Sequence, residues 1–175
     1  MPAKFAHHEV ALVTPLHSAE PSPSEVISLE CALTVLARYD HYLVVPRGIA
    51  VERYEEIFRR HGKKLRVVRF EKDCFRSVAA YCRLLNSARF YRRFARYEFM
   101  LIYQLDCYVF RDELLHWCDK GYDYIGAPWF KGFDQAREDA AFVGVGNGGL
   151  SLRRIPAALR ALRRYHAARH WHRVF

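Results

Sequence analysis

The sequence predicts one α/β domain with a mostly parallel central sheet that is covered by helices on both faces. Short apolar runs rich in β-forming residues alternate with segments of helical periodicity. The chain has 175 residues, of which 51% are hydrophobic, so it is long and apolar enough for one domain with its own core. Neither an internal repeat nor a linker divides it, and we expect residues 1–175 to form a single domain.

The composition excludes several classes of protein. An aromatic content of 15% is too high for a disordered, collagen-like or low-complexity chain. No stretch approaches 18 apolar residues, and the N-terminus lacks the apolar region of a secretory signal. We therefore expect neither a membrane span nor export. Five cysteines at irregular spacing favour reduced thiols and a cytoplasmic location.

Strands and helices alternate in the first part of the chain. The predicted strands cover residues 9–16, 41–45 and 65–70, because each is a short β-rich run. The predicted helices cover residues 25–37 and 51–60. Ser24 is the predicted N-cap of the first helix, after a loop rich in Ser and Pro, and Gly62 is the predicted end of the second.

The second part continues the alternation. The predicted strands cover residues 98–103 and 122–126, and the predicted helices cover 75–95, 112–120 and about 155–170. The strand over 98–103 is the most apolar, so we expect it in the middle of the sheet. Asp112 is the predicted cap of its helix, and Pro156 opens the last one. The polar residues 130–142 are expected to form a mobile loop.

Positive charge gathers at the C-terminal end. No acidic residue follows Asp139, whereas seven arginines do, so this end carries +7 of the net +9. Such a segment attracts phosphates. It predicts either a solvated helix face or a peripheral membrane contact through the Arg-rich helix over 155–170, at the inner membrane face. A second basic cluster lies beside aromatic residues that fit a buried helical stripe, so we do not expect nucleic-acid binding; its members are Arg89, Arg92, Arg93 and Arg96.

Asp106 follows directly after the most apolar predicted strand. A carboxylate at the end of a central strand is costly to desolvate, so it needs a hydrogen-bond partner, a counter-charge or a metal ion. Ligands of parallel sheets bind beyond the carboxyl ends of the strands. We therefore expect Asp106 to face a divalent ion or a ribose hydroxyl. A role in a turn or a helix cap is the alternative, although Asp112 suits capping better.

Glycine is concentrated in the sequence GVGNGG, from Gly144 to Gly149. Glycine permits positive φ and a close approach of backbone to ligand. The spacing also matches G-x-G-x-x-G, but it lies far from the first strand and lacks a following acidic residue, so we reject dinucleotide binding. We expect a ligand-binding turn with Asn147 and Ser151 as its polar contacts. A tight glycine hairpin is the alternative.

Trp129 lies just after a short predicted strand, in the sequence GYDYIGAPWF. A tryptophan at the mouth of a sheet can stack on the flat apolar face of a sugar or a base. Burial beneath the following loop is the alternative. The sequence thus makes Trp129 a candidate for sugar binding.

Two strings of the sequence, in this order, resemble the DUF5672 family: YEFMLIYQLDCYVFRDELLHWCDKGYDYIGAPWF at 97–130 and VGNGGLSLRR at 145–154. The segments ISLECAL at 27–33 and FRSVAAYCRLLNSARFYRRF at 75–94 resemble it as well, and the resemblance covers Val10 to Arg154. These bacterial proteins are regarded as glycosyltransferase-like, with a Rossmann-like fold of the GT-A type. The resemblance implies transfer of a sugar from a nucleotide-sugar donor to an acceptor hydroxyl.

The resemblance also implies a metal site. GT-A enzymes hold the donor diphosphate through Mn²⁺ or Mg²⁺ on an Asp-x-Asp sequence after a central strand. Here only Asp106 matches, with Gln104 or Tyr108 at the other position. One carboxylate is compatible with Mg²⁺, which keeps several waters and binds substrate phosphates. In the alternative, arginines neutralise the leaving diphosphate without a metal.

Further site residues follow from position within the resemblance. Thr14 and Pro15, at the end of the first strand, are expected to hold the nucleoside, and Arg153 is expected to bind a phosphate. The turn Asn147, Gly148, Gly149 is expected to border donor and acceptor, with Ser151 and Trp129 in the sugar pocket.

The C-terminal end determines what activity is expected. Family members continue beyond the last helix with an acidic segment that could supply a catalytic base, so the resemblance implies that this chain is truncated and leaves the base unassigned. Our leading hypothesis is a glycosyltransferase of cell-envelope or capsular polysaccharide synthesis that uses a glycan or a lipid-linked acceptor. The alternative is a non-catalytic nucleotide- or glycan-binding module.

Overall fold

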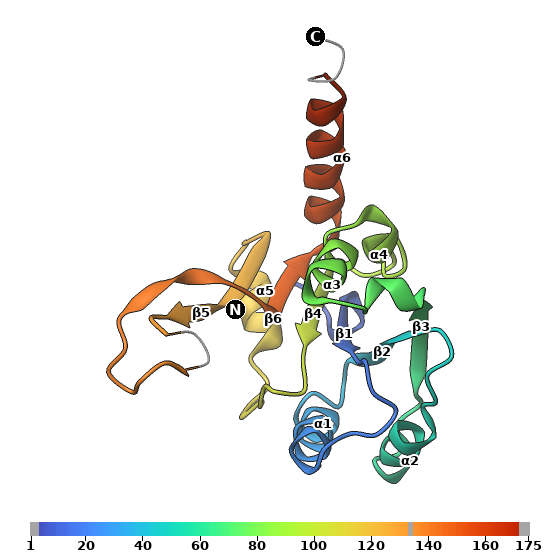
Figure 1. Ribbon diagram of the computed structural model, residues 1–175. Helices are drawn as coiled ribbons and strands as arrows, with labels where there is room; N and C mark the ends of the chain where they lie inside the picture. The colour runs from blue at the N-terminus through green and yellow to red at the C-terminus, as the bar shows by residue number, and fades with distance from the viewer. Residues whose placement is uncertain (1–3, 133–134, 172–175) are drawn as a thin grey trace.

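A computed structural model describes residues 4–132 and 135–171 as a six-stranded sheet between two layers of helices (Figure 1). The strand order is β3-β2-β1-β4-β6-β5. The strands are β1 Val10–Pro15, β2 Asp40–Pro46, β3 Arg66–Phe70, β4 Phe99–Tyr103, β5 Tyr124–Phe130 and β6 Phe142–Arg154. The first four run parallel, and β6 runs antiparallel to both β4 and β5. The predicted fold class, α/β with a mostly parallel sheet, is confirmed.

The central strand β1 contributes to both cores. Val10 and Leu12 lie in one core, whereas Ala11 and Val13 lie in the other, and all four are fully buried. This alternation follows from the two-residue period of a strand. A strand buried on both faces has no polar side, which is why β1 appears in the sequence as a continuous apolar run.

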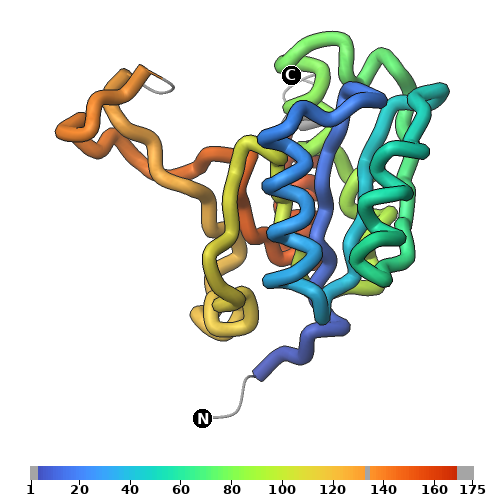
Figure 2. Tube along the Cα trace, turned by 90° about the horizontal axis from the view of Figure 1, so that it is seen from below, coloured from blue at the N-terminus to red at the C-terminus, as the bar shows by residue number. Residues whose placement is uncertain are grey.

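Helices cover both faces, as predicted, and Figure 2 shows α1 and α2 side by side along the sheet. The helices of one layer are α1 Pro23–Val35, α2 Glu52–Arg60 and α5 Leu114–Asp119, and those of the other are α3 Val78–Leu85, α4 Ala88–Arg92 and α6 Ile155–Trp171. Short 3₁₀ turns cover His7–Glu9 and Lys72–Cys74.

Two predicted helix caps shift by one or two residues. Ser22, not Ser24, caps α1: its Oγ accepts a hydrogen bond from the Glu25 amide at 3.3 Å, and the Glu25 carboxylate accepts one from the Ser22 amide at 2.7 Å. This reciprocal pair is a capping box. In α5 the cap position is Glu113, while Asp112 accepts a hydrogen bond from the Leu114 amide and pairs with Arg38.

The single helix predicted over 75–95 is wrong, because the segment forms two short helices. α3 ends at Leu85, and Ser87 begins α4 by accepting a hydrogen bond from the Phe90 amide at 3.3 Å. The Ser87 hydroxyl also donates to the Leu84 carbonyl at 2.7 Å. The serine thus competes for backbone groups that would continue the helix.

The segment predicted as a glycine turn is instead strand β6. Its thirteen residues pair with β4 through Leu150–Arg154 and with β5 over most of its length. β5 continues through Pro128, which an edge strand tolerates, and its pairing has register shifts on both sides of Ala127. The far half of β5 and β6 projects from the body (Figures 1 and 2). The loop predicted over 130–142 is therefore shorter at both ends, and residues 133–134 lie outside the described residues.

α6 follows β6 without a loop, because β6 ends at Arg154 and α6 begins at Ile155. The Ile155 amide donates to the Glu98 carbonyl at 2.9 Å. Leu159 and Leu162 pack against the core, and the rest of the helix extends away from the body (Figure 1). Among the described residues, no helix combines the length and the apolar character that crossing a membrane requires.

The core beneath α4 allows a test of the packing. Phe90 is fully buried, and its ring contacts those of Phe70 and Phe94 at centroid distances of 5.9 and 5.5 Å. Phe90→Ala should lower the free energy of unfolding by about 3–5 kcal/mol, because it leaves a cavity. Phe110→Ala is the control, since that ring is 86% exposed, and it should change stability by less than about 0.5 kcal/mol. Equal losses in urea denaturation would contradict the assigned core.

Candidate nucleotide-binding cleft

A cleft of about 400 Å³ lies at the carboxyl ends of β1 and β4. The chain adds β2 and β3 on one side of β1 and then returns to place β4 on the other side, so the strand order reverses between β1 and β4. Ligands of doubly wound sheets bind at this switch point. The described residues that line the cleft are Pro15, Leu16, His17, Ser18, Glu25, Tyr54, Phe75, Ser77, Val78, Tyr81, Gln104, Leu105 and Asp106.

Asp106 lies in this cleft with its side chain exposed, three residues after β4 ends at Tyr103. Among the described residues, its carboxylate forms no ion pair, and its hydrogen-bond partner is the Cys107 thiol at 3.6 Å. Burial and the neighbouring Asp106 carboxylate raise the pKa of Cys107 to about 12. The thiol therefore stays protonated, and the carboxylate of Asp106 stays open to a ligand.

The cleft is acidic. Glu25 and Asp106 both line it, and no lysine or arginine belongs to its described lining. Carboxylate oxygens are ligands that Mg²⁺ and Mn²⁺ prefer. The described residues contain no group of three or more His, Cys, Asp and Glu that could hold a metal ion. The donor set therefore fits a divalent ion only when ligand phosphates complete its coordination.

Gln104 connects the cleft to the glycines of β6. Its side-chain amide donates to the Tyr81 hydroxyl at 3.0 Å, and its backbone amide donates to the Gly149 carbonyl at 2.9 Å. A Cβ on Gly149 would lie 2.5 Å from Gln104 Oε1, so only glycine leaves room for this side chain. Asn147 Oδ1 accepts a hydrogen bond from the Gly149 amide at 2.9 Å. The glycine segment thus adjoins the cleft through Gln104, within a strand and not as a turn.

Arg153 lies outside the cleft, contrary to its predicted contact with phosphate. Its side chain is 5% exposed. Its guanidinium donates to Ser151 Oγ at 3.0 Å, to the Tyr91 hydroxyl at 3.1 Å and to the Leu85 carbonyl at 3.2 Å. These protein acceptors occupy the N–H groups of Arg153 that would have to bind a phosphate. Arg153 therefore joins β6 to α3 and α4.

The other predicted residues lie in different places. Pro15 lines the cleft, whereas Thr14 is buried within β1 and is not among the described lining residues. Ser151 is buried and donates to the Gly148 carbonyl at 3.0 Å. Trp129 lies half-buried on the projecting part of β5, opposite Gly144. The structure thus brings Pro15 and Asp106 together, with Asn147 and Gly149 behind Gln104.

Sequence reasoning missed several lining residues. Tyr81 falls within the helix predicted over 75–95, and it is half-buried against the cleft, where burial raises the pKa of its hydroxyl to about 12. Glu25 and Tyr54 come from α1 and α2. Gln104 and His17 each follow directly after a predicted strand, and this position was the available signal that they line a cleft. No local pattern marks Glu25 or Tyr54, because tertiary packing brings them to the cleft.

Fold and cleft together define an α/β protein with an open cleft at the switch point of its sheet. A family model described as "Protein of unknown function (DUF5672)" matches residues 64–174, more than half of the chain. The chain belongs to the DUF5672 family. The matched range begins after the segment 27–33 that also resembled the family.

Solved structures of two enzymes are similar to this chain. One is described as a cytidylyltransferase from Leptospira borgpetersenii serovar Hardjo-bovis, with 10% identity and a TM-score of 0.49 over 88% of this chain. The other is described as PaToxG glycosyltransferase, with 11% identity and a TM-score of 0.39 over 81% of this chain. The alignments cover 63% of the first protein and 56% of the second. No curated protein matches this chain.

The contact between Gly149 and Gln104 can be tested by a mutant cycle. Gly149→Ala should displace the Gln104 side chain and break its hydrogen bond with Tyr81, at a cost of about 1–2 kcal/mol. In a Gln104→Ala background the same change should cost less than about 0.5 kcal/mol, because the overlapping atom is gone. Urea denaturation of the four proteins measures this coupling.

Gly144→Ala is the matched control in the same strand, since a Cβ there meets nothing within 4 Å. It should leave stability within about 0.5 kcal/mol of the wild type. If Gly149→Ala costs the same in both backgrounds, the proposed close approach of Gln104 is wrong.

Proposed function

We propose that this chain binds a nucleotide-sugar donor in the cleft and belongs to a glycosyltransferase that passes the sugar to an acceptor hydroxyl. The observation that carries the proposal is the exposed carboxylate of Asp106 in an open cleft at the switch point of the sheet. A volume of about 400 Å³ lies within the range of small-molecule sites. The family resemblance supports the same assignment, with cell-envelope or capsular polysaccharide synthesis as its setting.

The charges of the cleft support a divalent ion as part of donor binding. A nucleoside diphosphate is strongly anionic, and this cleft presents two carboxylates and no described basic side chain. Like charges at short range disfavour binding. Asp106 would hold Mn²⁺ or Mg²⁺ together with the diphosphate, and the ion would stabilise negative charge on the leaving group. These charges favour the metal over the alternative in which arginines neutralise the diphosphate.

The remaining lining residues would position the donor. Phe75 and Tyr81 lie with their ring centroids 6.4 Å apart at one wall, where they offer aromatic faces to a base or a sugar. Gln104, held by Tyr81, keeps its amide oxygen beside Gly149 at the back of the cleft. Deprotonation of the acceptor hydroxyl needs a general base. We assign none, and the acceptor is a glycan or a lipid-linked sugar.

Donor binding can be measured by thermal unfolding of the full chain. UDP with MnCl₂ at about one hundred times Kd should stabilise the protein by about 2.7 kcal/mol, which corresponds to a rise in Tm of about 5–10 °C. UDP without the metal should give a much smaller rise, because the two carboxylates then repel it. Asp106→Asn should abolish the metal-dependent rise while leaving the Tm of the free protein nearly unchanged.

Asp139→Asn is the matched control, because that carboxylate is exposed and pairs with Arg137, outside the described lining of the cleft. It should leave the ligand-induced rise intact. GDP, CDP, ADP and dTDP replace UDP in parallel samples. Absence of a rise with every diphosphate, with and without metal, would refute the proposed donor site.

A non-catalytic nucleotide- or glycan-binding module is the second candidate. It is favoured by the single carboxylate after β4, where glycosyltransferases of the GT-A type carry two, and by the lack of a three-ligand metal group among the described residues. Slow release of free sugar from a nucleotide-sugar donor separates the two functions. An enzyme should release sugar in an Asp106-dependent manner, whereas a binding module should show the Tm rise without release.

A further inference from the structure

Positive charge is concentrated in the α3–α4–α6 layer. Residues 74–97 and 140–175 contain thirteen arginines, no lysine and no acidic residue, so the rest of the chain has a net charge of −4. The first segment forms α3 and α4, and the second contains β6 and α6. α6 packs on α4, and all three helices cover the same core. The described arginines of α3, α4 and α6 are therefore gathered on one side of the sheet.

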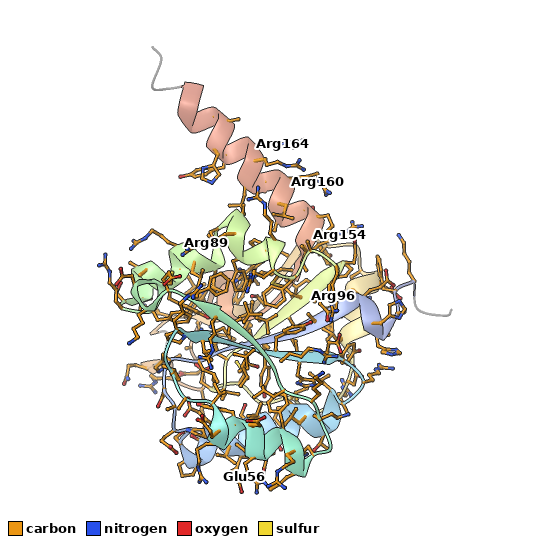
Figure 3. All side chains as sticks on the ribbon, turned by 90° about the vertical axis from the view of Figure 1, so that its right-hand side faces the viewer. Glu56, Arg89, Arg96, Arg154, Arg160 and Arg164 are labelled. Carbon is orange, nitrogen blue, oxygen red and sulfur yellow. The ribbon has the colours of Figure 1, made fainter. Side chains whose placement is uncertain are left out.

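The arginines of this layer are mostly exposed. We define the arginine surface as the exposed side chains Arg76, Arg83, Arg89, Arg92, Arg93, Arg160, Arg163 and Arg164. Figure 3 shows Arg89, Arg160 and Arg164 toward one end of the molecule and Glu56 of α2 at the opposite end. Arg153 is buried, Arg154 pairs with Glu98 at 2.7 Å, and the exposed Arg96 pairs with Asp40 at 2.9 Å, so none of these three belongs to this surface.

The arginine surface lacks counter-charges among the described residues. None of its eight members forms an ion pair there, whereas arginines of the opposite layer pair with acids, as Arg53 does with Glu20 and Arg60 with Glu30. Clustered like charges repel one another and disfavour the compact state. Arginine also binds phosphate through two parallel hydrogen bonds. An unpaired cluster of arginines thus fits a partner that presents many phosphates.

The partner that fits best is a lipid surface. Binding of single-stranded nucleic acid uses several exposed aromatic faces among the basic residues. Phe90, Tyr91 and Phe94, which lie among the arginines at 89–93, are at most 4% exposed, whereas Tyr165 of α6 is 56% exposed beside Arg164. The basic side chains lie on α3, α4 and α6 and on the segment before α3, and α6 projects from the body. A broad basic surface of this kind matches an anionic bilayer, which attracts clustered basic residues.

We propose that the arginine surface docks this protein on anionic phospholipid bilayers. The attraction is electrostatic, because the apolar residues Leu159 and Leu162 of α6 pack against the core and are not free to insert. α3 also lines the nucleotide cleft through Val78 and Tyr81, so docking brings that cleft beside the membrane. The inference rests on charge and exposure, and it holds whether or not the cleft binds a nucleotide sugar.

The test is co-sedimentation of the full chain with phosphatidylcholine vesicles that do or do not contain phosphatidylglycerol. The protein should bind only the anionic vesicles, and binding should fall steeply with salt. A variant with Arg92, Arg93, Arg160, Arg163 and Arg164 all changed to Gln should bind roughly tenfold more weakly or worse. Circular dichroism and Tm establish that each variant is folded.

The control variant changes Arg47, Arg53, Arg59, Arg60 and Lys64 to Gln, which lowers the net charge from +9 to +4 just as the first variant does. It should keep its binding within about twofold, because these residues lie outside the arginine surface. Equal losses in the two variants would show that net charge alone acts, and would overturn the proposal. So would a lack of binding to anionic vesicles at low salt, or preferential binding to duplex DNA or RNA in competition at equal phosphate.

Discussion

The parallel pairing of β1 with β4 is the interaction on which the rest of this structure depends. It places β4 on the opposite side of β1 from β2, so the chain leaves the two strands in different directions. The segment after β1 passes to α1 on one face, while α3 arrives from the other face. The space between them is the cleft, and its position follows from topology and not from any one side chain.

The sheet also separates two electrostatic environments. The cleft presents carboxylates from α1 and from the segment after β4, whereas α3, α4 and α6 carry arginines without acids. Tyr81 stands where these environments meet, because its helix both lines the cleft and carries Arg83. A metal-bound diphosphate and a bilayer would thus be bound by different charges on neighbouring surfaces.

The parallel strands could be predicted because strands buried on both faces appear as apolar runs with clear ends. The break in the helix over 75–95 could not, because the apolar period continues from Leu84 to Tyr91 and only the hydrogen bonds of Ser87 interrupt the backbone. β6 was missed because glycines normally weaken strands, and its pairing with both β4 and β5 is a tertiary effect.

The candidate site shows the same division between local and tertiary signals. Asp106 was found because the residue after a central strand is a known ligand position. The approach of Gln104 to Gly149 depends on the register between β4 and β6, which no local pattern records. Arg153 was placed wrongly because an arginine beside an arginine-rich helix gives no sign that its guanidinium is enclosed.

That enclosed guanidinium has a consequence for how β6 folds. Glycine-rich strands specify their alignment poorly, and a shift by one residue moves every side chain to the other face. Such a slip here would exchange Leu152 with Arg153, and a cation would enter the apolar layer beneath α1 and α5. Its hydrogen bonds to Leu85 and Tyr91 would be lost at the same time. Arg153 thus disfavours slipped pairings of the glycine-rich strand β6, so β6 pairs with its neighbours in one register.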